Sequence, residues 1–223
     1  MMKEDDWPVR SFGPDDVALV SCERKYSGYF AVDLYNVRHR RHDGGWTQPV
    51  QREVFISGDA VVVLPYDPVH DTVVLIEQFR AGPYANTGRT RPQEAWLVET
   101  IAGRFEPGEA PEDVARREAL EEAGCRLGHF FPMGAFYQSP GCIAEKIHYF
   151  CAITDTDGVG GIHGLDHEDE DIRVIVMGRE AALQGIANGR INNVTLAFAL
   201  QWLELNRHHI LRESRKSTPA AIE

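Results

Sequence analysis

The chain has 223 residues, of which 43% are hydrophobic and 26% are charged, and its formal net charge is −11. Length and composition fit a globular protein with one large domain and a smaller appendage. The negative charge argues against general binding to nucleic acid or to anionic membranes, because both need basic surfaces. No apolar run reaches the length of a membrane span, and the opening MMKEDDWPVR is too acidic and polar for a signal peptide.

The first predicted elements along the chain are β-strands. Strands are expected over Val17–Cys22, Tyr29–Arg40 and Thr47–Ile56, and Asp43-Gly44-Gly45 is a turn before the third. We therefore predict a small antiparallel β-domain over residues 1–58.

Residues 59–212 alternate between apolar strands and helical segments, and residues 213–223 read as a flexible polar tail. We expect exposed loops at Tyr84–Pro92 and Thr154–Asp171. Helices are expected from Pro111 to the stop at Gly124, over Arg179–Ala187 and over Asn193–Arg207. The expected strands are Ala60–Leu64, Thr72–Phe79, Trp96–Ile101, Phe131–Gln138, Lys146–Ile153 and Ile172–Met177. The order predicts an α/β fold, an α/β/α sandwich with a mixed sheet behind the small β-domain.

Cysteine usage indicates a reducing compartment. Cys22, Cys125, Cys142 and Cys151 show no C-x-x-C spacing, so we expect reduced thiols that are mostly buried. The protein is therefore expected to be cytoplasmic.

The segment GRFEPGEAPEDVARREALEEAGC, from Gly103 to Cys125, carries a high density of carboxylates on a predicted helix. Glu118, Glu121 and Glu122 share one face, because positions i, i+3 and i+4 are neighbours on a helix. Such carboxylates repel one another, and a cation between them would remove the repulsion. Hard oxygen ligands suit Mg²⁺ or Mn²⁺. A bare E-x-x-E-E would fit a solvated acidic face equally well.

The full spacing of this segment resembles the box of the Nudix hydrolases, G-x5-E-x7-R-E-U-x-E-E-x-G-U with U aliphatic. The chain departs from it at both U positions, where it has the small apolar residues Ala119 and Cys125. Nudix proteins use divalent metal to hydrolyse a nucleoside diphosphate linked to another group. The resemblance implies metal ligation by the carboxylates of Glu118, Glu121 and Glu122 and by the backbone carbonyl of Ala102.

Three supporting roles follow from the same resemblance. Glu109 would hold the loop geometry, and Arg117 would orient the glutamates. The catalytic base would lie in the box, at Glu122, or in the later acidic loop Gly164–Val174, where Glu168 is the preferred candidate and Glu170 the alternative. Taken alone, that acidic loop would be an ordinary solvated charge run.

The chain also resembles one Nudix branch beyond the box, the ADP-ribose pyrophosphatases of the bacterial type. The segments that carry this resemblance are SGYFAVDLY, VVLIEQFR, SPG and GIHGLDHEDEDIRV, and Pro140 lies sixteen residues after Gly124, as in that branch. The loop at Tyr84–Pro92 is longer than expected for the branch.

Substrate roles are implied residue by residue. Tyr29 and Phe30 would stack on or flank adenine, and Arg52 and Arg80 would contact the phosphates or terminal ribose. Ser139 would line the terminal-ribose side, and Glu145 is a further polar candidate for substrate binding. The branch forms homodimers through swapped N-terminal β-domains. The reaction would convert ADP-ribose and water into AMP and ribose 5-phosphate.

Two other activities stay open at this point. A nucleotide-sugar pyrophosphatase acting on a compound such as GDP-mannose would share every metal ligand. A catalytically silent Nudix domain that senses ADP-ribose would usually lack box glutamates or carry a DNA-binding module, and this chain has all its box glutamates and no basic tail.

Overall fold

The computed structural model describes residues 12–87, 90–105, 108–165, 167 and 169–217. The chain divides into two compact units, one formed by Met1–Gly58 with Tyr137–Glu145 and the other by Asp59–Phe136 with Lys146–Glu223. The sequence interpretation had assigned residues 137–145 to the second domain, whereas the structure joins them to the first unit.

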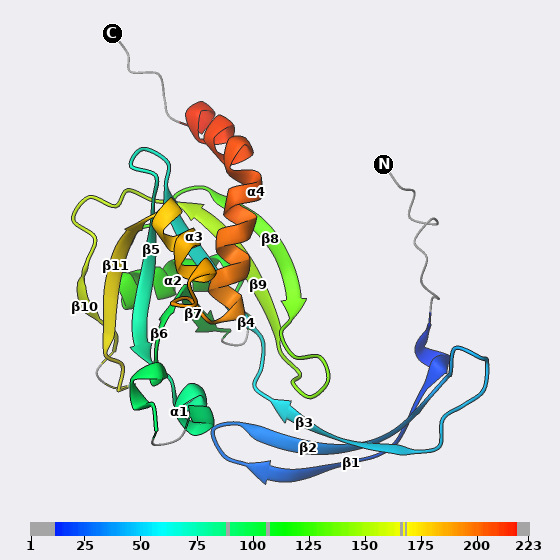
Figure 1. Ribbon diagram of the computed structural model, residues 1–223. Helices are drawn as coiled ribbons and strands as arrows, with labels where there is room; N and C mark the ends of the chain where they lie inside the picture. Colours follow the sequence, from blue (N-terminus) through cyan, green and yellow to red (C-terminus); the bar gives the residue numbers. More distant parts are fainter. Residues whose placement is uncertain (1–11, 88–89, 106–107, 166, 168, 218–223) are drawn as a thin grey trace. The chain divides into compact units, whose positions relative to one another are not determined.

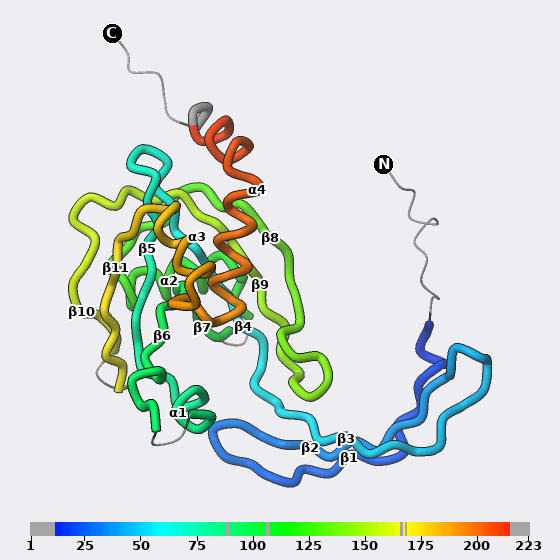
Figure 2. Tube along the Cα trace, in the orientation of Figure 1, coloured from blue at the N-terminus to red at the C-terminus, as the bar shows by residue number. Residues whose placement is uncertain are grey.

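The first unit is built on an antiparallel sheet with the order β1-β2-β3, which forms a long curved ribbon in Figure 2. The strands are β1 (Val17–Ser27), β2 (Ala31–His39) and β3 (Val50–Ile56), after a short 3-10 turn η2 (Pro14–Asp16). Almost every residue of β1 is exposed. Only Ala31 and Asp33 of this sheet are buried, so the sheet has little core of its own.

Residues 137–145 pack along β3. Phe55 N donates to Cys142 O at 2.8 Å, and Ala144 N donates to Phe55 O at 3.0 Å. These bonds continue the sheet beyond its third strand by a short parallel bridge between Phe55 and Ile143.

The second unit contains an eight-stranded mixed sheet with the order β10-β11-β5-β4-β9-β8, in which β6 pairs with β5 and β7 with β4. All described pairs are antiparallel except β4 with β9. The strands are β4 (Ala60–Asp67), β5 (Thr72–Phe79), β6 (Trp96–Glu99), β7 (Ile101–Arg104), β8 (Phe130–Tyr137), β9 (Lys146–Ile153), β10 (Gly161–His163) and β11 (Ile172–Gly178).

Helices cover both faces of this sheet (Figure 1). On one face α3 (Arg179–Ala187) and α4 (Val194–Ser217) enclose a core that includes Leu75 and Leu200. On the other face α2 (Pro111–Ala123) encloses a second core that includes Ile76 and Ala119. Strands β4 and β5 are buried on both sides, as their unbroken apolar runs indicate. The α/β/α sandwich expected from the sequence is confirmed.

Four local predictions were wrong. The segment predicted as the loop Tyr84–Pro92 contains the end of helix α1 (Ala81–Thr87) and the start of the 3-10 turn η3 (Pro92–Ala95). The predicted loop Thr154–Asp171 includes the short edge strand β10, and α4 continues to Ser217 instead of ending at Arg207. Tyr29 and Phe30 lie in a bend before β2 instead of in the strand, because Gly28 N donates to Phe30 O.

All four cysteines are free. Cys125 and Cys151 are buried, but Cys22 and Cys142 are exposed, so the expectation of mostly buried thiols held for half of them. In the described ranges, no helix combines the length and the apolar character needed to cross a membrane.

Candidate active site

The helix α2 begins and ends as its sequence dictates. Pro111 occupies the first turn, followed by the acidic residues Glu112 and Asp113, which suit the positive end of the helix dipole. At the other end Gly124 adopts a left-handed conformation with φ 59° and donates its N–H to Leu120 O. A residue without a β-carbon takes this conformation most easily. The helix thereby presents its glutamates next to strand β7.

Glu122 is the most enclosed carboxylate of the helix, with 3% of its surface exposed. Its Oε2 accepts a hydrogen bond of 3.0 Å from Ala102 N. Burial raises the pKa of Glu122 well above its ordinary value, while the Ala102 N–H and Arg80 act in the opposite direction. The structure thus brings Glu122 and the backbone of Ala102 together, two of the predicted metal-binding positions.

Glu118 lies directly over Gly103. A β-carbon on Gly103 would be 1.9 Å from Glu118 Oε1, so only glycine leaves room for this carboxylate. Burial raises the pKa of Glu118 to about 7, and the charges of Glu121 and Glu170 add to the rise while Arg117 opposes it. Glu118 and Glu122 therefore share a partly dehydrated, electronegative environment.

Arg117 binds several acidic groups of the box at once. Its Nη1 donates to Glu118 Oε1 at 2.8 Å and to Glu121 Oε2 at 3.1 Å, and Nη2 donates to Arg104 O. Its Nε lies 3.5 Å from Glu109 Oε1. These contacts match the orienting role proposed for Arg117 and the supporting role proposed for Glu109.

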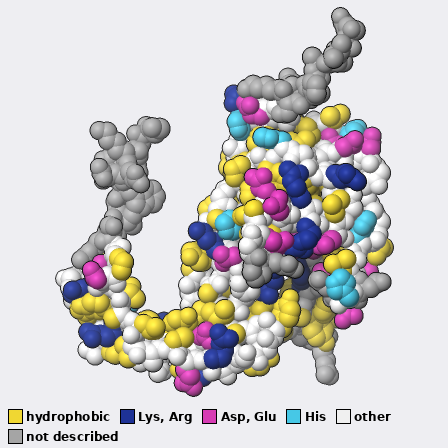
Figure 3. Space-filling view, turned by 180° about the vertical axis from the view of Figure 1, so that it is seen from behind, with side chains coloured by type: hydrophobic (Ala, Val, Ile, Leu, Met, Phe, Trp, Pro, Cys, Tyr) yellow, Lys and Arg dark blue, Asp and Glu magenta, His cyan; other side chains and the backbone are white. Residues whose placement is uncertain are grey.

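The chemistry of this donor set fits a hard divalent cation. Glu118 and Glu122 are enclosed enough for their negative charge to be unfavourable, and a cation would lower the free energy of their ionised forms. On the α2 side of the larger unit, seen from behind in Figure 3, Asp and Glu side chains are intermixed with Lys and Arg. Although the net charge of the chain is −11, a diphosphate would meet both positive and negative side chains on this side.

A separate group of potential ligands lies elsewhere in the second unit. One ligand atom each of Asp67, His70 and Asp155 falls within 4.8 Å of the others. Asp67, however, already accepts hydrogen bonds from Val69 N, from Thr156 N and Oγ1, and from His70. These donors occupy the lone pairs that a metal would need, so Asp67 acts as a structural hub between two turns.

The acidic loop before β11 contributes one described candidate for the base. Glu170 Oε2 accepts a hydrogen bond from Leu165 N at 3.3 Å, and its charge raises the pKa of both Glu118 and Glu122. Glu170 therefore lies within electrostatic reach of the box glutamates. Glu168, the preferred base in the sequence interpretation, lies outside the described residues.

Arg80 directly follows the end of β5, on the side of the sheet that α2 covers. Its Nε donates to Glu99 Oε2 at 2.8 Å, and Arg80 lowers the pKa of Glu122. Glu99 was not among the predicted site residues. Its role depends on the pairing of β5 with β6, which strand patterns alone do not reveal.

The aromatic candidates lie in the first unit. Tyr29 is 84% exposed and contacts Phe30 edge to face at 4.8 Å between ring centroids. Phe30 also contacts Phe55 at 4.7 Å. Phe30 is therefore partly used in packing, whereas Tyr29 presents a ring that a flat base could stack on.

The remaining candidates of the first unit are polar and surface-accessible. Arg52 donates through Nη1 to Gln51 O at 2.7 Å, and Glu145 Oε1 accepts from Ser57 Oγ at 3.3 Å. Ser139 is half-buried, and its Oγ lies 3.8 Å from Cys142 Sγ. The segment that follows, Pro140–Ala144, lines a cavity of about 320 Å³ with Val54 and Tyr137.

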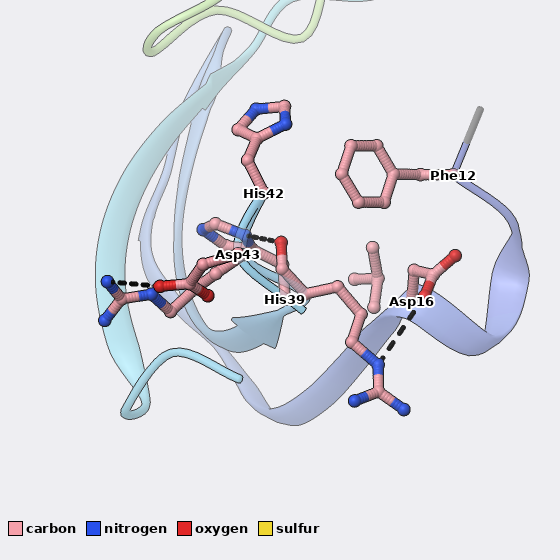
Figure 4. Close-up of a pocket in the computed structure, with 8 residues that line it drawn as sticks. Phe12, Asp16, His39, His42 and Asp43 are labelled. Atoms are coloured by element: carbon pink, nitrogen blue, oxygen red, sulfur yellow. Dashed lines mark hydrogen bonds and ion pairs between the residues drawn. The ribbon is translucent and has the colours of Figure 1, made fainter. Parts of the chain in front are cut away.

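A larger cavity of about 600 Å³ lies at the other end of the first unit. Phe12 and His42 line it and contact each other edge to face with ring centroids 5.4 Å apart (Figure 4). Arg40 Nε lies 3.6 Å from Asp16 Oδ1. None of the predicted site residues lines this cavity. It therefore has no place in the site that the box defines.

Comparison with known proteins agrees with the geometry. Residues 57–196 match the NUDIX domain family. The chain is 45% identical over 213 residues to the ADP-ribose pyrophosphatase of Escherichia coli strain K12, covering 96% of this chain and 99% of that one. It is 38% identical over 209 residues to the ADP-ribose pyrophosphatase of Haemophilus influenzae, covering 94% and 95%.

Two more distant similarities complete the comparison. The chain is 33% identical over 191 residues to a GDP-mannose pyrophosphatase of Escherichia coli O1:K1, covering 85% of this chain and 96% of the other. A solved structure described as an ADP compounds hydrolase superposes with a TM-score of 0.65 at 18% identity, covering 89% of this chain and 98% of that one, and so shares its fold. With its box glutamates gathered on α2 and this extent of similarity, the chain belongs to the Nudix family.

Proposed function

We propose that the protein hydrolyses the diphosphate of ADP-ribose, with water, to AMP and ribose 5-phosphate. The observation that carries the proposal is the similarity to the Escherichia coli ADP-ribose pyrophosphatase at 45% identity over nearly the full length of both chains. The described geometry of the box supports it, since Glu118 and Glu122 are enclosed beside Ala102 and Gly103.

The proposed cofactor is a divalent cation, Mg²⁺ or Mn²⁺, held by Glu118, Glu121, Glu122 and the carbonyl of Ala102. When bound, it would neutralise charge on the diphosphate and increase the acidity of a bound water. Arg117 would keep the glutamates in place through its bonds to Glu118 and Glu121.

Proton removal from the attacking water is assigned to a carboxylate of the acidic loop, Glu168 or Glu170. The position of Glu170 within reach of Glu118 and Glu122 supports the second candidate.

Substrate contacts are assigned residue by residue. Tyr29 and Phe30 would hold adenine by stacking, and Arg52 and Arg80 would bind phosphate oxygens through the planar guanidinium. Ser139 would contact the terminal ribose, and Glu145 would be a further polar contact to the substrate. The largely exposed β1 sheet supports a homodimer formed by swapped N-terminal domains. The free cysteines agree with a cytoplasmic location.

A hydrolysis panel tests the proposal. Purified protein with Mg²⁺ is incubated with ADP-ribose, GDP-mannose, UDP-glucose, NADH and diadenosine polyphosphates, and the products are identified. The expected result is a strong preference for ADP-ribose with release of AMP. Preference for GDP-mannose, which the 33% identity to a GDP-mannose pyrophosphatase makes the second candidate, would contradict the substrate assignment. Binding of ADP-ribose without turnover would contradict the catalytic one.

A further inference from the structure

Two polar side chains of the second unit are buried with a side-chain atom that has no hydrogen-bond partner among the described residues. They are Gln78, with Nε2 unpaired, and Thr100, with Oγ1 unpaired. Gln78 is 7% exposed and Thr100 is 1% exposed. Leaving a donor unpaired in the interior is unfavourable, so each such group calls for a physical explanation.

The two side chains belong to opposite faces of the sheet. On β5, Val74 and Ile76 pack in the core beneath α2, whereas Val73 and Leu75 pack in the core beneath α4. Alternation along a strand therefore places Gln78 on the α2 side. Thr100 is two positions from both Val98 and Ala102, which pack against the core beneath α4. Residues two positions apart share a face, so Thr100 belongs to the α4 face.

Gln78 is a neighbour of the residues assigned to the reaction. Arg80 is two positions further along the chain, about 7 Å away for an extended segment, and its charge acts on Glu122. Leu97 lies opposite Gln78 on β6, and Glu99, the partner of Arg80, is two positions beyond it. The side chain of Gln78 thus lies on the same face of the sheet as Arg80. Helix α2, which carries Glu122, covers this face.

The carboxylates on this side are already supplied with donors from other groups. Glu122 accepts from Ala102 N, Glu118 from Arg117, and Glu170 from Leu165 N. None of them uses Gln78. Among the described residues, the amide atom of Gln78 that is both enclosed and unpaired is Nε2. A half-turn about the Cγ–Cδ bond of Gln78 exchanges the positions of Nε2 and Oε1. This rotation can present the N–H to the other side without moving the backbone.

We propose that Gln78 is a further substrate-binding residue, whose side-chain amide donates a hydrogen bond to an anionic oxygen of the bound diphosphate beside Arg80. The inference rests on the proposed function, because it needs a diphosphate at the box. A neutral donor is suited to this position, since it binds an anionic oxygen without forming an ion pair with the nearby glutamates. Thr100, on the opposite face, has no such role.

Two substitutions that remove the unpaired groups test the proposal. Gln78→Met keeps the length of the side chain and removes the amide, and Thr100→Val is the matched control on the other face. Tm without substrate, kcat, KM for ADP-ribose and the half-saturating Mg²⁺ concentration are measured for each. Both variants should keep or raise Tm, because each removes a buried unpaired donor.

The kinetics should separate the two variants. Gln78→Met should lower kcat/KM by about tenfold to a hundredfold, mainly through KM, because it loses a hydrogen bond to a charged group. Thr100→Val should retain the kinetics of the unsubstituted protein. Unchanged kinetics in Gln78→Met would overturn the proposal. So would a raised Mg²⁺ requirement at unchanged KM, which would make Gln78 a support of the metal-binding carboxylates.

A third variant covers the case in which Gln78→Met fails to fold. Gln78→Glu keeps the shape but replaces the donor with a negative charge, so it should lower kcat/KM at least as far as Gln78→Met. Full activity of Gln78→Glu would overturn the proposal. Failure of the proposed function has a different signature, because the unsubstituted protein would then not hydrolyse ADP-ribose. The Gln78 comparison would in that case be made with the diphosphate that the panel identifies.

Discussion

Gly103 and Glu118 are in such close contact that a β-carbon on the glycine would lie 1.9 Å from Glu118 Oε1 and 2.0 Å from its Cδ. Strand β7 and helix α2 therefore approach each other so closely that the Glu118 carboxylate of the helix excludes a side chain at Gly103 of the strand. The absence of a side chain at Gly103 positions a functional group that lies fifteen residues later in the sequence.

Gly103→Ala should displace the Glu118 carboxylate without unfolding the protein, because the atoms that must move belong to a flexible side chain. We expect kcat/KM to fall about 100-fold, since misplacement of a positioned group by an ångström has effects of that order. Steady-state kinetics and Tm provide the measurement. Gly178→Ala, where an added β-carbon meets nothing within 4 Å, is the control and should retain activity. Equal activity of the two variants would contradict the assigned role of Glu118.

Glu122→Gln should reduce turnover by about 10³-fold or more, because the variant retains the hydrogen-bond acceptor for Ala102 N but loses the charge that a divalent cation requires. Tm in the absence of metal should not fall, since burial already disfavours the ionised form. The matched control is Glu112→Gln, an exposed glutamate in the first turn of the same helix. Near-normal turnover of Glu122→Gln would rule out a metal-binding role for this residue.

The base is tested by comparing Glu170→Gln with Glu168→Gln. Loss of a general base acts on the transition state, so the correct variant should lose about 10²- to 10⁴-fold in kcat with little change in KM. We expect the larger loss for Glu170→Gln, because its carboxylate acts on Glu118 and Glu122. A pure KM effect in both variants would assign the loop to binding.

The box and the order of strands could be predicted because both are local patterns. Glycine, proline and glutamate spacing defines the ends and the acidic face of α2, and unbroken apolar runs identify β4 and β5 as buried strands. The helix α1 could not be predicted, because Ala81–Thr87 contains glycine and proline and buries no residue. Glu99 and Gln78 were missed for a different reason. Their importance depends on which strands are neighbours and which face each side chain occupies, and this information is long-range.

Glu99→Gln should weaken substrate binding through Arg80. The carboxylate of Glu99 is 16% exposed and accepts from Arg80 Nε, which holds the guanidinium in place. Within the described part of the chain, the other N–H groups of the Arg80 guanidinium make no hydrogen bond and are available to a substrate. KM should rise about tenfold with kcat changed much less, since the contact is made in ground state and transition state alike. The control is Glu77→Gln, on β5, which breaks the ion pair between Glu77 and Arg173 at the surface. It should change neither KM nor kcat. A fall in kcat alone would place Glu99 in the catalytic step.

Asp67→Asn should destabilise the fold in a pH-dependent way. Burial alone would raise the pKa of Asp67, but hydrogen bonds from His70, Thr156 and Val69 outweigh it and hold the pKa below the usual range. A depressed carboxyl pKa contributes stability above the unfolded-state pKa, about 3.9, and this contribution is lost as the pH falls toward the folded-state value. At pH 7 the variant should lose about 2–4 kcal/mol of unfolding free energy, because the asparagine amide cannot accept from every donor that binds the carboxylate.

Urea unfolding of the unsubstituted protein and of Asp67→Asn at pH 7, 5 and 3 checks this prediction. The difference should be larger at pH 5 than at pH 7, because Asp67 raises the pKa of His70 and the protonated His70 adds stability as the pH falls. It should shrink at pH 3, where the carboxyl group of the unfolded chain is mostly protonated while that of the folded protein is still ionised. Asp157→Asn, at an exposed position in the same turn, is the control and should leave the free energy of unfolding nearly unchanged at each pH. A difference that stays constant down to pH 3 would mean that the shape of Asp67, and not its charge, holds the two turns together.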